Sequence, residues 1–435
     1  MIGLFTGVGF GLYRAISKSL PNNDFGLCRG KTQPGNSNPG LTDWLADLID
    51  DIAGRDPKTD PPLTFGDLST AAGPPDGKSI NLRMMTTNLT LRRPYSLPLS
   101  EAVYAFRLDD FKELFPERIT TYLVEHCERV DEPGEHKDLF KFPMAENLPL
   151  VVAARLSLSF PLLFCAVPLY ARDFTLNTEQ EKAKWRKNLF SDGGLSSNFP
   201  IHFFDRLLPN SPTFAISLDT YDANRQRNES GVSPDDPRAR VWLPKTGSAV
   251  SGLLISGQPL NGILAFLSSL IDSAKDWQDN LQSTLAGYRD RIVHIDLKAE
   301  EGGLNIAMPP KLVLSLGAYG AQAGVDLREL FDLDEHRWRR FLVAMTRLNQ
   351  ALDDFATAYD GQDKIESFAD FLARYPDNPP NLPVSYKRAA RDHLELLRDR
   401  AAALAKLGLD WHSQPQIPDS KLPHPGADMR ITPRT

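Results

Sequence analysis

Apolar residues recur along this chain at two kinds of spacing, which predict helices in some segments and strands in others. From Leu41 to Gly54 they return every three or four residues, and we predict an amphipathic helix there. Thr42 or Asp43 is the candidate N-cap, and Gly54 is the candidate stop. Two longer charged segments, rich in alanine and leucine, predict helices in the last third of the chain, at 334–359 and 385–407.

Shorter runs of β-branched and apolar residues predict strands. Ile80–Leu91 is one such run, and Arg92-Arg93-Pro94 is expected to end it. Thr213–Leu218 is predicted as a buried strand, and Arg291–Lys298 as a further strand. A helix is expected at 201–208, so strands alternate with helices. This alternation predicts an α/β fold with buried strands.

The first sixteen residues are mostly apolar, but Arg14 interrupts them and Lys18 follows. About 18–20 apolar residues are needed to cross a bilayer, so this segment alone is too short. A signal peptide would have basic residues before its apolar run, and this chain has none there. Two interpretations stay open: a core-packing helix with a glycine at every fourth position, or the end of a membrane-associated hairpin.

Composition narrows the choice of function. The net charge of −7 gives no sign of the basic surface that a nucleic-acid-binding protein usually has. Cys28, Cys127 and Cys165 are odd in number and widely spaced, so we expect neither a disulfide framework nor a zinc site. No cofactor or metal motif is recognised, and a reducing cytoplasmic location is the default expectation.

Asp192-Gly193-Gly194, which follows the apolar residue Phe190, is the most informative motif. It predicts a carboxylate at the end of a strand, where glycines let the backbone turn sharply. Ser191, Ser196 and Ser197 flank it and are interpreted as turn and cap residues. Without its surroundings, Asp-Gly-Gly would be an ordinary turn.

The surroundings of this motif resemble a bacterial branch of the patatin-like phospholipases over roughly Phe25 to Tyr359. Further matching blocks lie, in order, at 25–30, 41–45, 63–68, 85–90, 154–161, 287–291, 301–305 and 336–338. The resemblance implies a three-layer α/β/α sheet domain at 25–300, incomplete at its N-terminus. Around it we expect an apolar helix at 1–24 that is a candidate for membrane association, a helical region at 301–411, and a disordered tail at 412–435.

The same resemblance implies acyl-ester hydrolysis by a Ser–Asp dyad. Asp192 would be the proton acceptor, while Gly193 and Gly194 would let the following chain pass close behind it. The family's Gly-x-Ser-x-Gly nucleophile elbow is absent from the whole sequence. The segment Gly247–Gly252 has the wrong spacing and lies after the Asp. We therefore expect an N-terminally shortened family member that holds one half of the dyad.

Other candidate residues are less specific. The segment Leu148–Leu163 contains Arg155, Ser157 and Ser159, which could line the site or simply pack beside it. Four histidines, at 126, 202, 294 and 336, show no metal-ligand spacing.

Three functions remain open at this point: a lipid acyl hydrolase whose serine lies outside this chain, an inactive lipid-binding or regulatory pseudoenzyme, and a subunit complemented by a separate chain. Expected partners are a lipid or membrane surface, and a second copy or partner chain that covers an exposed sheet edge.

Overall fold

The computed structural model describes residues 15–70, 79–130, 138–173, 184–196, 200–221, 232–244, 287–302, 305, 307–361, 366–374 and 391–415. The protein is of the mixed α/β class. It divides into two compact units, and among the described residues the boundary lies between Pro200 and Ile201. This boundary falls inside the 25–300 range that the sequence led us to treat as one domain. Residues 1–14 and most of the expected tail lie outside the described residues.

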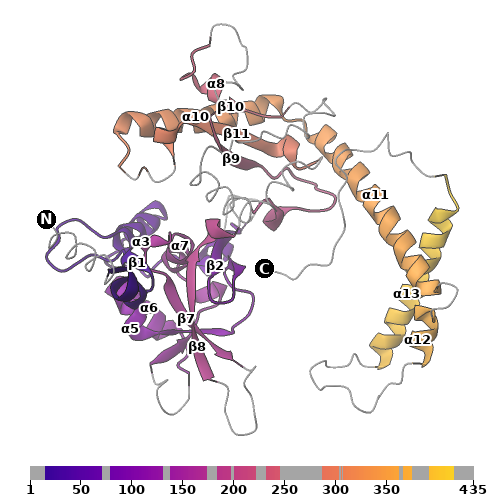
Figure 1. Cartoon of the computed structure of the whole chain (residues 1–435), viewed down its shortest axis with the longest axis horizontal. Helices are drawn as coiled ribbons and strands as arrows, with labels where there is room; N and C mark the ends of the chain where they lie inside the picture. Colours follow the sequence, from indigo (N-terminus) through magenta and orange to yellow (C-terminus); the bar gives the residue numbers. More distant parts are fainter. Residues whose placement is uncertain are drawn as a thin grey trace, which may run out of the picture. The chain divides into compact units, whose positions relative to one another are not determined.

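The first unit contains a six-stranded sheet in the order β3-β2-β8-β7-β4-β5, of which β2, β7 and β8 are labelled in Figure 1. Every neighbouring pair in it is antiparallel. β1 and β6 form a separate parallel pair. The bounds are β1 Gly26–Cys28, β2 Met84–Asn88, β3 Arg93–Leu97, β4 Tyr104–Arg107, β5 Leu139–Lys141, β6 Leu162–Phe164, β7 Val167–Asp173 and β8 Lys184–Asp192.

The strand predicted at Ile80–Leu91 is present but shorter, as β2. The arginines and proline expected to end it instead turn the chain into β3, with Arg92 at a φ of 56°. Pro94 is tolerated there because β3 lies at the edge of the sheet, where a missing N–H donor breaks no ladder on the outer side. β2 and β3 therefore pair as a hairpin without an intervening helix, and β7 and β8 are antiparallel neighbours.

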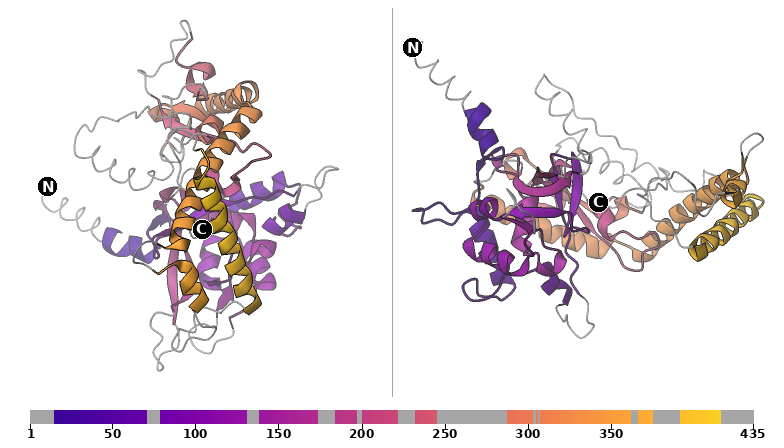
Figure 2. Two further views of the ribbon diagram at one scale, coloured as in Figure 1. Left: turned by 90° about the vertical axis from the view of Figure 1, so that its right-hand side faces the viewer. Right: turned by 90° about the horizontal axis from the view of Figure 1, so that it is seen from below.

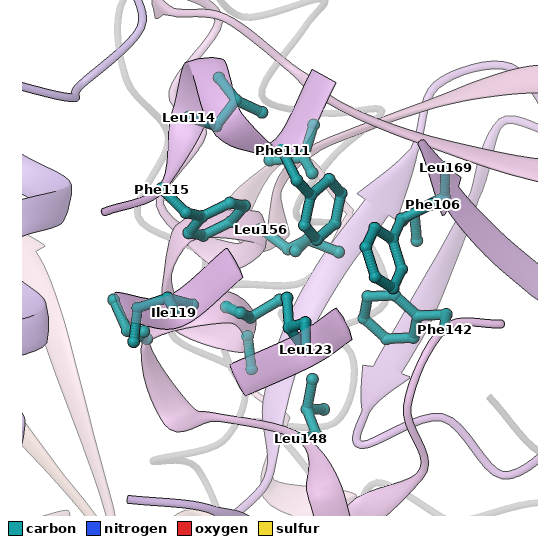
Figure 3. Close-up of a cluster of buried hydrophobic side chains, with 14 of the residues drawn as sticks. Phe106, Phe111, Leu114, Phe115, Ile119, Leu123, Phe142, Leu148, Leu156 and Leu169 are labelled. Carbon is teal, nitrogen blue, oxygen red and sulfur yellow. The ribbon is translucent and has the colours of Figure 1, made fainter. Parts of the chain in front are cut away.

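Helices of the first unit bury one apolar core against this sheet. Aromatic side chains from the α5 region and β4 meet in it, with Phe106 and Phe111 at a ring-centroid distance of 4.5 Å (Figure 3). The helix predicted from Leu41 is confirmed as α3, but its N-cap is Gly40, with no side-chain cap. The helices are α2 Leu20–Asn22, α3 Leu41–Ile52, α4 Phe65–Thr70, α5 Leu108–Leu114, α6 Glu117–His126 and α7 Leu150–Ser157, preceded by a π-helical turn, η1 Ala15–Ser19.

The second unit contains a three-stranded sheet in the order β10-β11-β9. β9 and β11 are parallel, whereas β10 and β11 are antiparallel. α10 packs on β10 and β11, and Figure 1 shows it alongside these strands. The bounds are β9 Ala215–Thr220, α8 Pro237–Arg240, β10 Val241–Trp242, β11 Ile292–Leu297 and α10 Pro310–Leu330. The helix expected at 201–208 is only a 3-10 turn, η4 Ile201–Phe204. The strand predicted at Thr213–Leu218 is present as β9, but the prediction of its burial is wrong, because Ile216 and Leu218 are 55% and 66% exposed.

A helical hairpin completes the second unit. α11 Leu333–Asp360 and α13 Arg391–His412 lie side by side in both figures that show the whole chain, and α12 Phe368–Arg374 packs on α11 (Figures 1 and 2). The two helices approach closely because Gly408 faces the backbone of α11, where an added Cβ would lie 2.3 Å from the Leu352 carbonyl oxygen. Both long helices predicted from sequence are confirmed over their described residues.

Buried charges link α11 to the segment before β11. Asp205 accepts hydrogen bonds from Arg291 Nη2 at 2.8 Å and from Arg340 Nη2 at 3.0 Å. His336 Nδ1 lies 2.8 Å from Asp290 Oδ2, and both side chains are buried. Separating Asp205 from its two arginines would leave an uncompensated charge at this depth, so their ion pairs hold α11 against the segment before β11.

A further buried carboxylate, Glu301, gives the second unit a defined acid response. Burial raises its pKa, but the Lys298 N–H and the Arg240 guanidinium lower it more, so the net pKa lies below the ordinary value. Its stabilising contribution is therefore full above the unfolded pKa of about 4.3 and is lost as pH falls through the folded value.

We expect the thermal stability of the second unit to fall steeply below about pH 4.3, and Glu301→Gln to flatten that dependence. The measurement is a series of melting curves between neutral and acid pH. Glu300→Gln changes the exposed neighbouring carboxylate and is the matched control. It should keep the wild-type dependence of the melting temperature on pH. An unchanged slope in Glu301→Gln would contradict this interpretation.

Candidate functional site

Asp192 is the last residue of β8 and the N-cap of a short 3-10 helix, η3 Gly193–Leu195. Its Oδ1 accepts a hydrogen bond from the Gly194 N–H at 2.6 Å. The side chain is partly buried. The sequence prediction of a carboxylate at a strand end followed by a glycine turn is therefore confirmed in its geometry.

β2 fixes the backbone of this turn from one side. Thr86 is the register partner of Asp192. Thr86 Oγ1 donates to the Ser191 carbonyl at 2.8 Å, and Thr87 Oγ1 donates to the Asp192 carbonyl at 2.8 Å. Thr87 Oγ1 also lies 2.7 Å from Ser196 Oγ, so the two ends of the turn are tied to one residue. Sequence reasoning missed these threonines, although two adjacent hydroxyl residues in a buried strand were a visible signal.

Gly193 is required by close packing. A Cβ added at this position would lie 2.3 Å from the Met85 carbonyl oxygen and 2.6 Å from the Met85 carbonyl carbon. Backbone atoms of a central strand cannot move aside as a flexible side chain could. The chain after Asp192 thus passes directly against β2, which is the close approach that the two glycines led us to expect.

The loop after α7 fixes the turn from the other side. The Asp192 N–H donates to the Ser159 carbonyl at 3.1 Å, and Ser191 Oγ donates to the same carbonyl at 2.7 Å. Ser157 is the half-buried last residue of α7 and takes part in none of these contacts. Of the two serines predicted near the site, only Ser159 is therefore joined to Asp192.

Arg155 holds this loop in place from the interior. Its side chain is 1% exposed, and its Nη2 donates to the Cys165 carbonyl at 3.0 Å and to the Arg29 carbonyl at 3.1 Å. Its Nη1 donates to Ser159 Oγ. Burial lowers the pKa of the guanidinium. Arg155 bonds Ser159, and Ser159 in turn bonds Asp192. Arg155 is therefore a positioning residue for Ser159.

Exposed apolar side chains lie on the loop that holds Asp192, at the start of β6 and at β1, which pairs with β6. We call Phe25, Leu27, Leu158, Phe160 and Leu162 the β1–β6 apolar surface; each is more than a third exposed. Leu162 pairs with Gly26, and Phe25 and Leu162 have positive φ values of 62° and 67°. Such backbone strain in non-glycine residues is concentrated at functional sites.

Comparison with known proteins identifies a relative. The chain is 32% identical to the protein named RpoH suppressor from Rhizobium meliloti (strain 1021), over 98% of this chain and 72% of the relative. The chain belongs to the RpoH suppressor family. No family model and no solved structure matches it.

Within this RpoH suppressor family member, the histidines form no common site with Asp192. His126 bonds the Tyr122 carbonyl on the surface of α6, while His294 and His336 each bond an aspartate in the second unit. The side chain of His202 lies outside the described residues. Among the residues that the structure describes, no group of three or more His, Cys, Asp or Glu side chains could hold a metal ion.

Hydrogen bonds hold both the backbone and the side chain of Asp192 in one orientation. Its backbone is bonded on both sides, its side chain is oriented by Gly194, and apolar side chains stand on the adjoining loop. A carboxylate held in this way can accept a proton from a hydroxyl group placed within hydrogen-bond distance. No helix among the described residues is both long and apolar enough to cross a membrane.

Proposed function

We propose that this protein is a patatin-like lipid acyl hydrolase component in which Asp192 is the proton acceptor of a Ser–Asp dyad. The serine and the oxyanion donors come from residues outside the 435-residue sequence, and the fold is the patatin-like three-layer arrangement. The protein works in the cytoplasm at a lipid surface, without a cofactor. The relative's name bears on neither reaction nor substrate, so the proposal rests on the Asp192 site.

The observation that supports it best is how the turn after β8 is held. An aspartate of ordinary pKa, about 3.9, is a weak base for an alcohol, so it must be partly desolvated and fixed beside its partner. Asp192 is partly buried, and Thr87 and Ser159 hold its backbone. Serine attack on the acyl carbon would pass the hydroxyl proton to Asp192, which then returns it to the leaving alcohol.

The β1–β6 apolar surface supports a lipid partner. Leucine and phenylalanine side chains left in water cost free energy that contact with acyl chains would recover, at about 1.5–3 kcal/mol per side chain. Leu158 and Phe160 flank Ser159, whose carbonyl is bonded to the Asp192 N–H, so a lipid bound there would have its ester near the carboxylate.

We expect the double variant Leu27→Glu/Leu158→Glu to bind phosphatidylglycerol–phosphatidylcholine vesicles at least ~10-fold more weakly, because two apolar contacts are replaced by charge. Vesicle co-sedimentation measures this directly. Ile52→Glu, which changes a comparably exposed side chain on α3, is the control and should bind as the wild type does. Equal loss in both variants would point to a general charge effect, against a specific surface.

The alternative is a catalytically inactive lipid-binding or regulatory pseudoenzyme, favoured by the absence of Gly-x-Ser-x-Gly from the sequence. The two proposals separate when the chain is produced together with the residues encoded in frame upstream of Met1. The hydrolase proposal expects those residues to contain the elbow and the mixture to cleave phospholipid. The pseudoenzyme alternative expects vesicle binding without ester cleavage.

A further inference from the structure

Arg155 is a buried cation that has no carboxylate partner in the described part of the chain. Its side chain is 1% exposed, and its guanidinium donates to two backbone carbonyls, to the Ser159 hydroxyl and to the Cys165 thiol. No Asp or Glu side chain among the described residues forms an ion pair with it. Burying a charge costs free energy unless an opposite charge lies beside it, so this guanidinium lacks the compensation that such depth requires.

Two other arginines of the same burial are paired. Arg240 forms an ion pair with Glu301, and Arg291 forms one with Asp205. The two arginine side chains are 0% and 1% exposed. The missing counter-ion is therefore a local feature of Arg155 and needs a local explanation.

The neighbouring thiols cannot supply the negative charge. Cys165 Sγ accepts a hydrogen bond from Arg155 Nη2 at 3.4 Å, and Cys28 interacts electrostatically with the same guanidinium. Burial raises the pKa of both thiols above the ordinary value, more than the positive charge of Arg155 lowers it. Both thiols are therefore protonated and neutral near pH 7.

One guanidinium nitrogen and one hydroxyl face the same position beside Gly30. Arg155 Nε and Thr42 Oγ1 are both buried, and neither has a hydrogen-bond partner among the described residues. A Cβ added to Gly30 would lie 2.9 Å from Thr42 Oγ1 and 3.4 Å from Arg155 Nε. Gly30 has a φ of 83°, a conformation that favours glycine. Two potential donors thus converge where the backbone carries no side chain.

The first turn of α3 adds to the positive character of this position. Thr42 is the second residue of this 12-residue helix, and the N-cap, Gly40, provides no side-chain acceptor. The N-terminal end of a helix carries a partial positive charge and favours anions. Asp43, in the same turn, accepts the Thr32 N–H at 2.8 Å and forms no ion pair with the guanidinium.

We propose that Arg155 Nε, Thr42 Oγ1 and the first turn of α3 form a binding site for a monovalent anion of the size of chloride. A water molecule would satisfy both donors but would leave the guanidinium charge uncompensated, whereas an anion satisfies the donors and the charge together. The burial of both side chains limits the size, since a single methyl group at Gly30 would already contact both donors. This inference does not depend on the proposed function.

The test compares melting curves of the full chain in sodium chloride and in sodium gluconate at equal ionic strength, because gluconate is too large for the site. With a dissociation constant of ~10 mM, chloride at about 100 mM should raise the melting temperature of the first unit by about 3–6 °C. The rise should level off with increasing chloride, and bromide should reproduce it. Hydrogen exchange of the α3 and α7 amides should slow under the same conditions.

Three variants show whether the effect belongs to this site. Thr42→Val removes one donor from a side chain of nearly the same shape and should lose most of the rise, whereas Thr42→Ser should keep it. Thr120→Val is the matched control, since it removes a buried hydroxyl that donates to the Glu117 carbonyl at 2.9 Å, and it should respond to chloride as the wild type does.

Equal wild-type melting temperatures in the two salts would overturn the proposal and leave water as the partner of both donors. A rise that Thr42→Val retains in full would also overturn it, because the rise would then be a general salt effect.

Discussion

Arg155→Ala is expected to lower the free energy of unfolding of the first unit by about 2–5 kcal/mol. The substitution removes a side chain that is almost completely buried and leaves three oxygen acceptors without this donor, in addition to the weaker acceptor Cys165 Sγ: the carbonyls of Arg29 and Cys165 and the Ser159 hydroxyl. A buried acceptor left unpaired costs about 1–3 kcal/mol unless water entering the vacated volume replaces the lost donor, and volume that stays empty adds a cavity term, so the total stays near the expected range. Denaturant unfolding followed by circular dichroism measures the change.

Arg29→Ala is the matched control for this experiment. The Arg29 side chain forms an ion pair with Glu113 at the surface, and such pairs contribute about 0–1 kcal/mol. Arg155→Lys should restore little of the loss, because a single ammonium cannot reproduce the planar fork of donors. A cost below about 1 kcal/mol for Arg155→Ala would show that the loop after α7 does not depend on this guanidinium.

Asp192→Asn is expected to reduce ester hydrolysis by the chain complexed with its upstream residues about 10²–10⁴-fold, the usual contribution of a general base. The amide is nearly isosteric, but it cannot take a proton from a serine. Its oxygen can still accept the Gly194 N–H, so the turn and the melting temperature should change little. The kcat/KM for phospholipid vesicles and the thermal melt are measured on the same preparation.

The control, Asp138→Asn, changes an exposed carboxylate that is paired with Arg129 at 3.6 Å, and should leave hydrolysis unchanged. Activity that survives Asp192→Asn at the wild-type level would remove this aspartate from the mechanism. A loss of activity that accompanies a lowered melting temperature would instead make Asp192 a structural cap.

The position of Asp192 could be predicted from the sequence because its cause is local. An apolar residue leading into Asp-Gly-Gly indicates a carboxylate at the end of a strand, followed by a sharp turn that glycines allow. The α3 helix and the helices at 334–359 and 385–407 follow equally from apolar periodicity over three or more turns.

The partners of Asp192 could not be predicted, because they come from distant parts of the chain. Thr86 and Thr87 meet it through antiparallel pairing of β2 with β8, and register between strands about a hundred residues apart is not encoded locally. Ser159 reaches Asp192 from the loop after α7, where Arg155 bonds its hydroxyl. The exposure of Ile216 and Leu218 could not be predicted either, because an apolar strand has the same sequence pattern whether its face is covered or exposed to solvent.

The central claim is that Asp192 activates a serine brought by residues outside this chain. The most direct measurement is labelling with a fluorophosphonate, in which the activated serine oxygen attacks phosphorus, fluoride leaves and the hydroxyl proton passes to the base. Mass spectrometry of the complex between this chain and its upstream residues should find the label on the serine of a Gly-x-Ser-x-Gly. The label should be absent when the complex contains Asp192→Asn. Equal labelling with Asp192→Asn, or no labelling of the wild-type complex, would contradict the account.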